Sequence, residues 1–300
     1  MNIRKITDSS ALVVAHPDDE ILWFSSILEQ IDEVVFCFMG VRSSPGVGRA
    51  RQQSLSSYPL KKVSCLGLEE SEVLNGADWH RPIVTDFGLK VVKSEYSLPG
   101  FSEKVYRTNY AVLVTELEHR LAGCRNVFTH NPWGEYGNEE HVQVYRAVNA
   151  LRKRMGFNLW FSNYCSNKSC NMMAQYISEP MLSFAIAEPN KELAKKIQAL
   201  YQRNNCWTWY NNYEWPAREA FLTCREDTVG GARDHQVFPV NMITTELPKE
   251  YAQRGKVRRW WNMIARPLRQ VRSWVRRTRY ENASGREAHA HFHQARQFHV

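Results

Sequence analysis

A mostly parallel sheet with covering helices is predicted by three features of the sequence. Short apolar runs recur along the chain, segments of helical length separate them, and turn residues bound each run. Runs that are apolar on both faces are typical of strands in a parallel sheet with helices on either side. We therefore expect an α/β protein with a Rossmann-like sheet and, after it, a basic amphipathic C-terminal tail.

The expected elements follow from these runs in chain order. The strands span residues 11–15, 33–40, 61–68, 126–130 and 158–164. The helices span residues 19–30, 48–57, 104–122, 139–154 and 190–203. Apolar residues recur at helical spacing in the third helix, and the last one follows the capping sequence EPN. Residues 69–103 contain Pro82 and Pro99 and form a long irregular excursion, which is often where function lies.

Composition bounds the domain organisation. The chain has 300 residues, and a hydrophobic content of 43% indicates a globular protein and excludes wholesale disorder. The net charge of +8 is concentrated, because residues 251–280 hold ten Lys or Arg and no acid. We expect one folded domain over residues 1–250 and a basic, aromatic tail over residues 251–300, partly helical and then disordered.

Cysteine usage and hydropathy indicate the compartment. The seven cysteines are odd in number and form no C-x-x-C pair, which favours reduced thiols. The first residues lack the apolar stretch of a signal peptide, and no run of about 18 apolar residues occurs. We expect a cytoplasmic protein.

The sequence AHPDDE, residues 15–20, directly follows the first expected strand. Ligands of open parallel sheets sit at the carboxyl ends of strands, where helix N-termini point at them. Asp18 and Asp19 could simply be acids of a helix cap. However, His16 lies three residues before Asp19, a spacing that lets an imidazole and a carboxylate meet one cation while Asp18 faces elsewhere.

A second polar cluster, THNPWGEYGNEEHVQV, follows the strand at 126–130. A loop broken by glycines leads into a helix that carries His141 in its first turn. If the two strand ends meet, His16, Asp19 and His141 form the two-histidine, one-carboxylate set of a catalytic zinc with an open position for water.

These two stretches resemble the LmbE/PIG-L family of zinc-dependent N-acetylglucosaminyl de-N-acetylases. The likeness is specific in the two motifs and looser over residues 8–222, where AREAF near the end is similar to the closing element of the family. The resemblance implies that His16, Asp19 and His141 bind Zn²⁺, with Fe²⁺ as the alternative metal. It also implies that Asp18 is the general base.

One position departs from the family pattern. A histidine is common three residues before the last ligand, and this chain has Asn138 there. An asparagine can donate a hydrogen bond to an oxyanion, but it cannot deliver a proton at neutral pH. The acid for the leaving amine is therefore open between Asp18 after protonation and a contribution from Tyr136 or Glu135.

Substrate contacts are expected from less specific positions. Arg51 resembles the sugar-binding arginine of the family, although a solvent-facing helix arginine is the competing interpretation. Asp78 resembles its substrate-contacting aspartate in a looser alignment. Trp79 and Trp133 could stack on a sugar face or simply pack in the interior.

The basic segment at residues 251–280 interleaves Trp and aliphatic residues with arginines at near-helical spacing. This pattern favours an anionic membrane surface as the partner, at the inner face of the membrane. Nucleic acid has the same charge requirement, but the segment matches no nucleic-acid-binding fold. An ordinary solvated or docking tail is the third interpretation.

Together these features predict a metal-dependent hydrolase that removes an acetyl group from an N-acetylated sugar or glycolipid, in cell-envelope polysaccharide or glycolipid biosynthesis. Two alternatives stay open at this point. One is a deacetylase of a small soluble amide or thiol-sugar, and the other is a catalytically impaired glycan-binding protein.

Overall fold

Seven strands form the central sheet of the computed structural model, which describes residues 3–177, 182–224 and 237–245. The strand order is β3-β2-β1-β6-β7-β10-β9. The first five strands in this order run parallel, and β10 runs antiparallel to both of its neighbours. Their bounds are β1 Ser10–Val14, β2 Glu33–Gly40, β3 Val63–Glu69, β6 Asn126–Thr129, β7 Asn158–Ser162, β9 Leu182–Ala187 and β10 Glu219–Cys224. The predicted α/β fold class with a mostly parallel sheet is confirmed.

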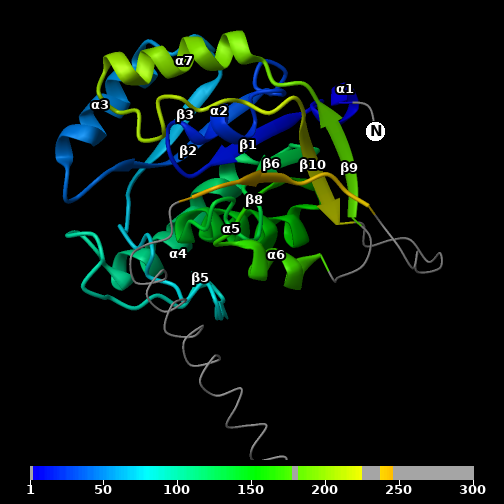
Figure 1. Cartoon of the computed structure of the whole chain (residues 1–300). Coiled ribbons are helices and arrows are strands. Elements are labelled where there is room, and N and C mark those ends of the chain that lie inside the picture. Colours follow the sequence, from blue (N-terminus) through cyan, green and yellow to red (C-terminus); the bar gives the residue numbers. More distant parts are fainter. Residues whose placement is uncertain (1–2, 178–181, 225–236, 246–300) are drawn as a thin grey trace, which may run out of the picture. The chain divides into compact units, whose positions relative to one another are not determined.

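Helices cover both faces of this sheet (Figure 1). In that view α3 and α7 lie on one side of the strands, and α4 and α5 lie on the other. The helices are α1 Ile3–Ile6, α2 Asp19–Trp23, α3 Pro45–Ser56, α4 Glu103–Arg120, α5 Glu139–Met155, α6 Cys170–Tyr176 and α7 Lys191–Arg203. Burial of β1 is complete at all five positions, as expected for a central parallel strand. The expected cap of α7 is present, because the Asn190 side chain accepts a hydrogen bond from Leu193 N.

The expected helix over 19–30 is shorter than predicted, since α2 ends at Trp23. The backbone N–H of Ser26, which would continue the helix, instead donates to the Glu219 carboxylate at 2.9 Å. Tyr213 and Trp215 donate to the carbonyls of Leu22 and Ile21, which the helix would otherwise leave unpaired. Hydrogen-bond partners far away in the sequence therefore end this helix. The helix propensities of residues 19–30 alone do not show where it ends.

The antiparallel end of the sheet was not expected from the apolar pattern. Strands β9 and β10 pair along their whole length, with Phe221 opposite Ala185. A separate small sheet pairs β8 (Tyr164–Ser166) with β11 (Asn241–Ile243) in parallel. Both pairs lie beyond residue 160, where short strands alternate with aromatic and Asn-rich sequence and give little periodicity.

The excursion expected over residues 69–103 lies between the end of β3 at Glu69 and the start of α4 at Glu103, and the buried Glu72 carboxylate ties it to the domain. It contains only the two-residue strands β4 (Val84–Thr85) and β5 (Gly88–Leu89). Glu72 accepts hydrogen bonds from the backbone of Ser43 and of Gly100. Any side chain at position 100 would collide with that carboxylate, because an added Cβ would lie 2.1 Å from Glu72 Oε1. The excursion is thus held against the carboxyl edge of the sheet.

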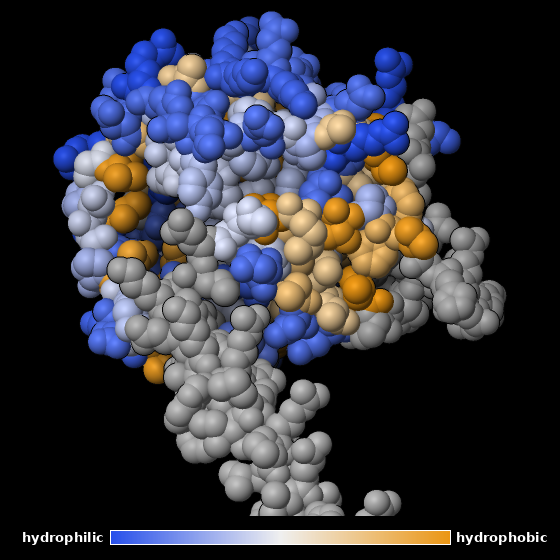
Figure 2. Space-filling model, viewed as in Figure 1, coloured by the Kyte–Doolittle hydropathy of each residue, from blue (hydrophilic) through white to orange (hydrophobic). Residues whose placement is uncertain are grey.

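One face of the described domain carries an apolar area. Figure 2 shows apolar side chains gathered on the face that carries β9 and β11. Exposed apolar residues of β9, of β11 and of the segment before β11 are Ile186, Met242 and Val237, at 40%, 61% and 90% of their full accessible area. Within the described ranges, every helix is too short or too polar to cross a membrane.

The chain divides into two units, Met1–Thr245 and Glu246–Val300. The second unit contains the expected tail and lies outside the described residues. The amphipathic helix over residues 251–280 and its membrane contact therefore stay predictions.

Candidate active site

Two neighbouring strand ends meet at the carboxyl edge of the sheet. Strands β1 and β6 pair in parallel, with Val13 opposite Thr129, so the loops that follow them lie side by side. The structure brings the three expected ligands together from these loops and from α5. Ligand atoms of His16, Asp19 and His141 all lie within 4.8 Å of one another, and all three residues are buried.

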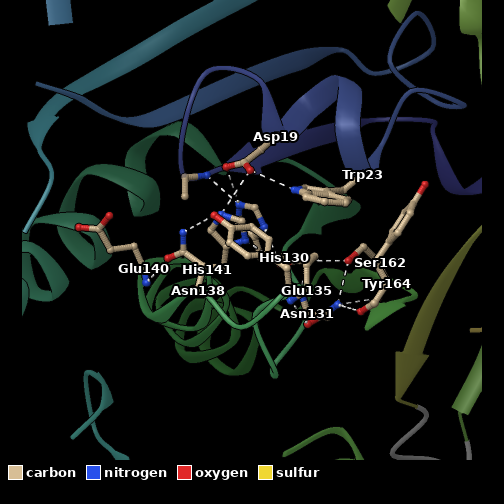
Figure 3. Close-up of polar contacts among 12 residues, drawn as sticks. Asp19, Trp23, His130, Asn131, Glu135, Asn138, Glu140, His141, Ser162 and Tyr164 are labelled. Carbon is tan, nitrogen blue, oxygen red and sulfur yellow. Dashed lines mark hydrogen bonds and ion pairs between the residues drawn. The ribbon is translucent and has the colours of Figure 1, made fainter. Parts of the chain in front are cut away.

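Asp19 stands at the centre of this group (Figure 3). Its Oδ1 accepts a hydrogen bond from Trp23 Nε1 and lies 3.2 Å from His141 Nε2. Its Oδ2 accepts from the backbone N–H of His16 and lies 3.4 Å from Nε2 of His130. Burial opposes ionisation of this carboxyl, but the neighbouring His141 and His130 prevail and hold the pKa of Asp19 well below its usual range.

Each of the two ligand histidines has a carboxylate behind it. His141 Nδ1 lies 2.8 Å from Glu135 Oε2, and His16 Nε2 lies 3.0 Å from Glu140 Oε2. The other nitrogen of each ring faces Asp19, at 3.2 Å for His141 Nε2 and 3.4 Å for His16 Nδ1. His141 Nε2 is buried and has no hydrogen-bond partner among the residues that the structure describes. Metal-binding imidazoles are typically held this way, with one nitrogen on a carboxylate and the other directed at the metal.

Two further groups in the described ranges could also surround an ion, but their atoms are engaged elsewhere. These groups are His130–Glu135–His141 and His16–Glu70–Glu140. Glu135 accepts hydrogen bonds from Asn131 N (2.9 Å) and from Ser162 Oγ, Glu70 accepts from Arg51, and Glu140 accepts from Ser71 N (2.6 Å). In the group of His16, Asp19 and His141, by contrast, the histidine nitrogens that face Asp19 stay available for a metal. The residues present therefore fit a divalent metal on His16, Asp19 and His141, with zinc or iron(II) matching two nitrogens and one oxygen.

His130 is the main residue of the site that sequence reasoning missed. Its ring stacks on His141, with centroids 3.8 Å apart, and its Nδ1 lies 3.0 Å from Glu135 Oε2. The backbone N of Ala15 lies 2.8 Å from His130 Nε2. A signal was present in the sequence: His130 follows β6 much as His16 follows β1.

Asp18 lies beside the metal group in a strained backbone conformation. Its φ of 122° is rare for a residue with a side chain and costs about 1–3 kcal/mol. Burial and the neighbouring Asp19 charge raise the pKa of Asp18 to about 7, while a hydrogen bond from Thr208 and the charge of Arg51 lower it. A carboxyl with a pKa near neutrality can both accept and return a proton.

Glu20 fixes the backbone that carries Asp18. Its carboxylate accepts from the backbone N–H of Asp18 at 2.9 Å and from the hydroxyls of Tyr58 and Tyr201. Burial raises the pKa of Glu20 to about 8, against these hydrogen bonds. The third acid of the opening motif therefore has a supporting role.

Tyr136 and Asn138 form a linked pair in the second loop. The side-chain amide of Asn138 donates to Tyr136 Oη at 2.7 Å, and its oxygen caps α5 by accepting from Glu140 N at 2.8 Å. The Tyr136 ring meets His141 edge to face, with centroids 5.3 Å apart. Asn138 thus caps α5, a role that the resemblance of its motif to the family did not indicate.

The two expected substrate contacts lie in different surroundings. Arg51 is buried, so the solvent-facing interpretation is wrong, and it forms an ion pair with Glu70 close to Asp18. Asp78 is exposed on the excursion, where its carboxylate accepts from the backbone N–H of His80.

Trp79 and Trp133 are packed in the interior. They are 2% and 1% exposed, and their indole N–H groups donate to Glu139 and to the Tyr164 carbonyl. Neither ring face is open for stacking on a sugar, which corrects that expectation.

The fold and the site together describe an α/β protein in which His16, Asp19 and His141, a candidate metal-binding group, lie at the carboxyl edge of the sheet. Two similar solved structures are deacetylases. Teicoplanin deacetylase Orf2, in a zinc-inhibited form, is 12% identical with a TM-score of 0.47, covering 73% of this chain and 99% of that one. The A40926 pseudoaglycone deacetylase Dbv21 is 13% identical with a TM-score of 0.41, covering 71% and 96%. No protein-family model and no curated protein matches this sequence.

Proposed function

We propose that this protein is a metal-dependent amide hydrolase that removes the acetyl group of an N-acetylated sugar. One observation carries the proposal: two carboxylate-backed histidines and Asp19 face one point, and Asp18, with a pKa near 7, lies beside them. The resemblance of the two motifs to zinc-dependent de-N-acetylases supports the same reaction.

The residues that would hold the metal are His16, Asp19 and His141. When bound, zinc supplies Lewis-acid chemistry, making water more acidic and polarising a carbonyl oxygen. Glu135 and Glu140 keep the two imidazoles in the orientation that leaves an unprotonated nitrogen facing inward. Burial of the group keeps bulk water from competing for these positions.

Asp18 is the general base of the proposed reaction. It takes the proton of the attacking water as the new C–O bond forms at the acetyl carbon. It then gives that proton to the nitrogen as the C–N bond breaks, so acetate and a free amine leave. Thr208 donates to Asp18 Oδ2, which holds the carboxylate and leaves Oδ1 for the proton.

Tyr136 is the donor to the developing oxyanion. Its hydroxyl oxygen accepts a hydrogen bond from Asn138, so its own proton can point toward the substrate. Asn138 thereby compensates in part for the histidine that the family pattern has at this position. It orients a donor, and Asp18 delivers the proton.

The substrate class is proposed to be an N-acetylhexosamine on a lipid or polysaccharide carrier, with Arg51 contacting the sugar or its phosphate and Asp78 contributing from the excursion. The basic segment over residues 251–280 would hold the protein on an anionic membrane surface, at the cytoplasmic face. The sequence of that segment supports this role. Fractionation of the full chain and of residues 1–250 at low salt tests it, and equal solubility of the two would argue against membrane association.

Acetate release is the test of the reaction. Zinc-loaded protein is offered free, nucleotide-linked and lipid-linked N-acetylhexosamines, beside the Asp18→Ala variant. We expect release from at least one form and its loss in the variant. A wild-type protein that binds zinc but releases no acetate from any form would instead favour a glycan-binding role.

A further inference from the structure

One short turn supports the loop that carries Glu135 and Tyr136. Three consecutive backbone carbonyls of this loop, at residues 135–137, each accept a side-chain hydrogen bond from the segment Ser166–Ser169. We call the segment the polar turn. The bonds run from Ser169 Oγ to Glu135 O (2.6 Å), from Ser166 Oγ to Tyr136 O (3.1 Å) and from Lys168 Nζ to Gly137 O.

These carbonyls need such partners because the loop is not helical. Gly134, Glu135 and Gly137 all have positive φ, at 67°, 48° and 89°. A left-handed conformation is unfavourable for Glu135, which has a side chain, and it persists only where surrounding contacts hold it. Buried carbonyls without partners would add a further cost. The polar turn therefore stabilises a conformation that the loop would not keep alone.

Lys168 is the most constrained member of the polar turn. It is only 8% exposed, its Nζ also donates to Asn75 Oδ1 at 2.7 Å, and the ammonium lies 5.0 Å from the centre of the Trp79 ring. The stem of the side chain packs on the loop, because a Cβ added to Gly137 would lie 2.8 Å from Lys168 Cδ. Lys168 thus joins the excursion and the site loop at one point.

The polar turn is itself held rigidly. Within it, Ser166 Oγ accepts from the backbone N–H of Lys168 and Ser169 Oγ accepts from that of Ser166. Outside it, the Asn167 side chain accepts from the N–H and the hydroxyl of Thr245, just beyond β11. A turn fixed from both sides can transmit its geometry to the loop that it contacts.

We propose that the polar turn is the positioning element of the active site and that Lys168 is its principal positioning residue. Lys168 acts through the loop: the turn sets where the Glu135 carboxylate stands, and Glu135 sets the orientation of His141 and His130. The same loop places the Tyr136 hydroxyl. The proposal rests on the proposed function for its effect on catalysis, while its effect on metal binding does not require a known substrate.

The test compares Lys168→Met with Lys153→Met in the full-length protein. Methionine keeps most of the stem that packs on the loop and removes the ammonium, and the control changes an exposed lysine of α5. We expect Lys168→Met to weaken zinc binding, measured by chelator competition, by about tenfold. We also expect faster hydrogen exchange at the amides of residues 134–138 and about tenfold lower kcat with KM little changed.

A second variant, Ser169→Ala, removes the partner of the Glu135 carbonyl and should show the same pattern more weakly. Wild-type zinc affinity and exchange in both variants would overturn the proposal. So would a lowered melting temperature with unchanged zinc affinity, since the turn would then be merely structural. Zinc affinity and exchange need no substrate, so failure of the acetate-release test would reject the proposed function without deciding this proposal.

Discussion

The two loops that build the site are stabilised in different ways. The β1–α2 loop is short and makes its own bonds, because Asp19 accepts from the backbone of His16 and Glu20 accepts from that of Asp18. The β6–α5 loop is longer, contains two glycines with positive φ, and relies on the polar turn for three of its carbonyls. The short loop carries Asp18 and leads into Asp19, and the long loop carries Glu135 and leads into Glu140 and His141 at the start of α5.

Changes in the short loop should therefore affect the chemistry, and changes in the long loop should affect the geometry of the site. Substitutions in the short loop remove a ligand or the base outright. Substitutions in the long loop leave every ligand residue present and change the orientation of the histidine rings toward the metal position.

The largest effect is expected from Asp19→Ala. Asp19 is the carboxylate that both ligand histidines face, so its loss should abolish zinc retention and reduce acetate release to background. Metal content after dialysis, measured by atomic absorption, checks this. The exposed Asp8→Ala is the matched control and should keep its zinc. Full zinc retention by Asp19→Ala would show that the metal group has been misidentified.

Asp18→Asn should separate chemistry from binding in the same loop. The amide cannot accept the proton of water, so kcat should fall by about 10²–10⁴. Zinc retention should match the wild-type protein, because Asp18 is not one of the ligands. Steady-state kinetics on zinc-loaded protein measures the first effect and metal analysis the second. Loss of zinc in Asp18→Asn would contradict the division of roles between the two aspartates.

Tyr136→Phe tests the oxyanion donor in the long loop. The ring that contacts His141 is kept and the hydroxyl is removed, so kcat should fall by about 10²–10³ with zinc affinity unchanged. Tyr210→Phe, at an exposed tyrosine, is the control. Unchanged kcat in Tyr136→Phe would remove Tyr136 from the mechanism and leave the oxyanion without this donor.

Glu135→Gln and Glu140→Gln sharpen the comparison between the two histidine supports. Each should lower zinc affinity by about 10–100-fold, measured by chelator competition. We expect the larger loss for Glu135, because its carboxylate serves both His141 and His130, whereas Glu140 serves His16. A larger loss in Glu140→Gln would show that the support of His16 matters more for zinc binding than the support of His141 and His130.

Much of the fold could be predicted because it follows from local pattern. The five parallel strands appear as apolar runs, and the Asn190 cap is visible as EPN before α7. The end of α2 could not be predicted, since Glu219, Tyr213 and Trp215 terminate it from almost 200 residues away. The pairing of β9 with β10 could not be predicted either, because pairing between short strands depends on tertiary neighbours.

Some residues of the candidate site could likewise be predicted from the sequence, and others could not. His16, Asp19 and His141 could be named from spacing at two strand ends, because parallel neighbours bring their carboxyl ends together. The residues that hold the histidines in place could not be predicted. Glu135, Glu140 and the polar turn act through tertiary contacts, which leave no periodic pattern in the sequence. Arg51 was a candidate whose burial only the structure decided.

The sequence by itself determined the class of fold and named His16, Asp19 and His141 as a candidate ligand set, because both depend on residue type and on position relative to a strand end; Asp18 as the base came from the resemblance of the motif. The tertiary structure alone decided which nitrogen of each histidine faces inward, why Asn138 caps α5, and what holds the loop of Glu135 in a left-handed conformation. The physical reason is that orientation depends on hydrogen bonds between segments far apart in the chain. Those bonds are directional and leave no repeating signal in the sequence.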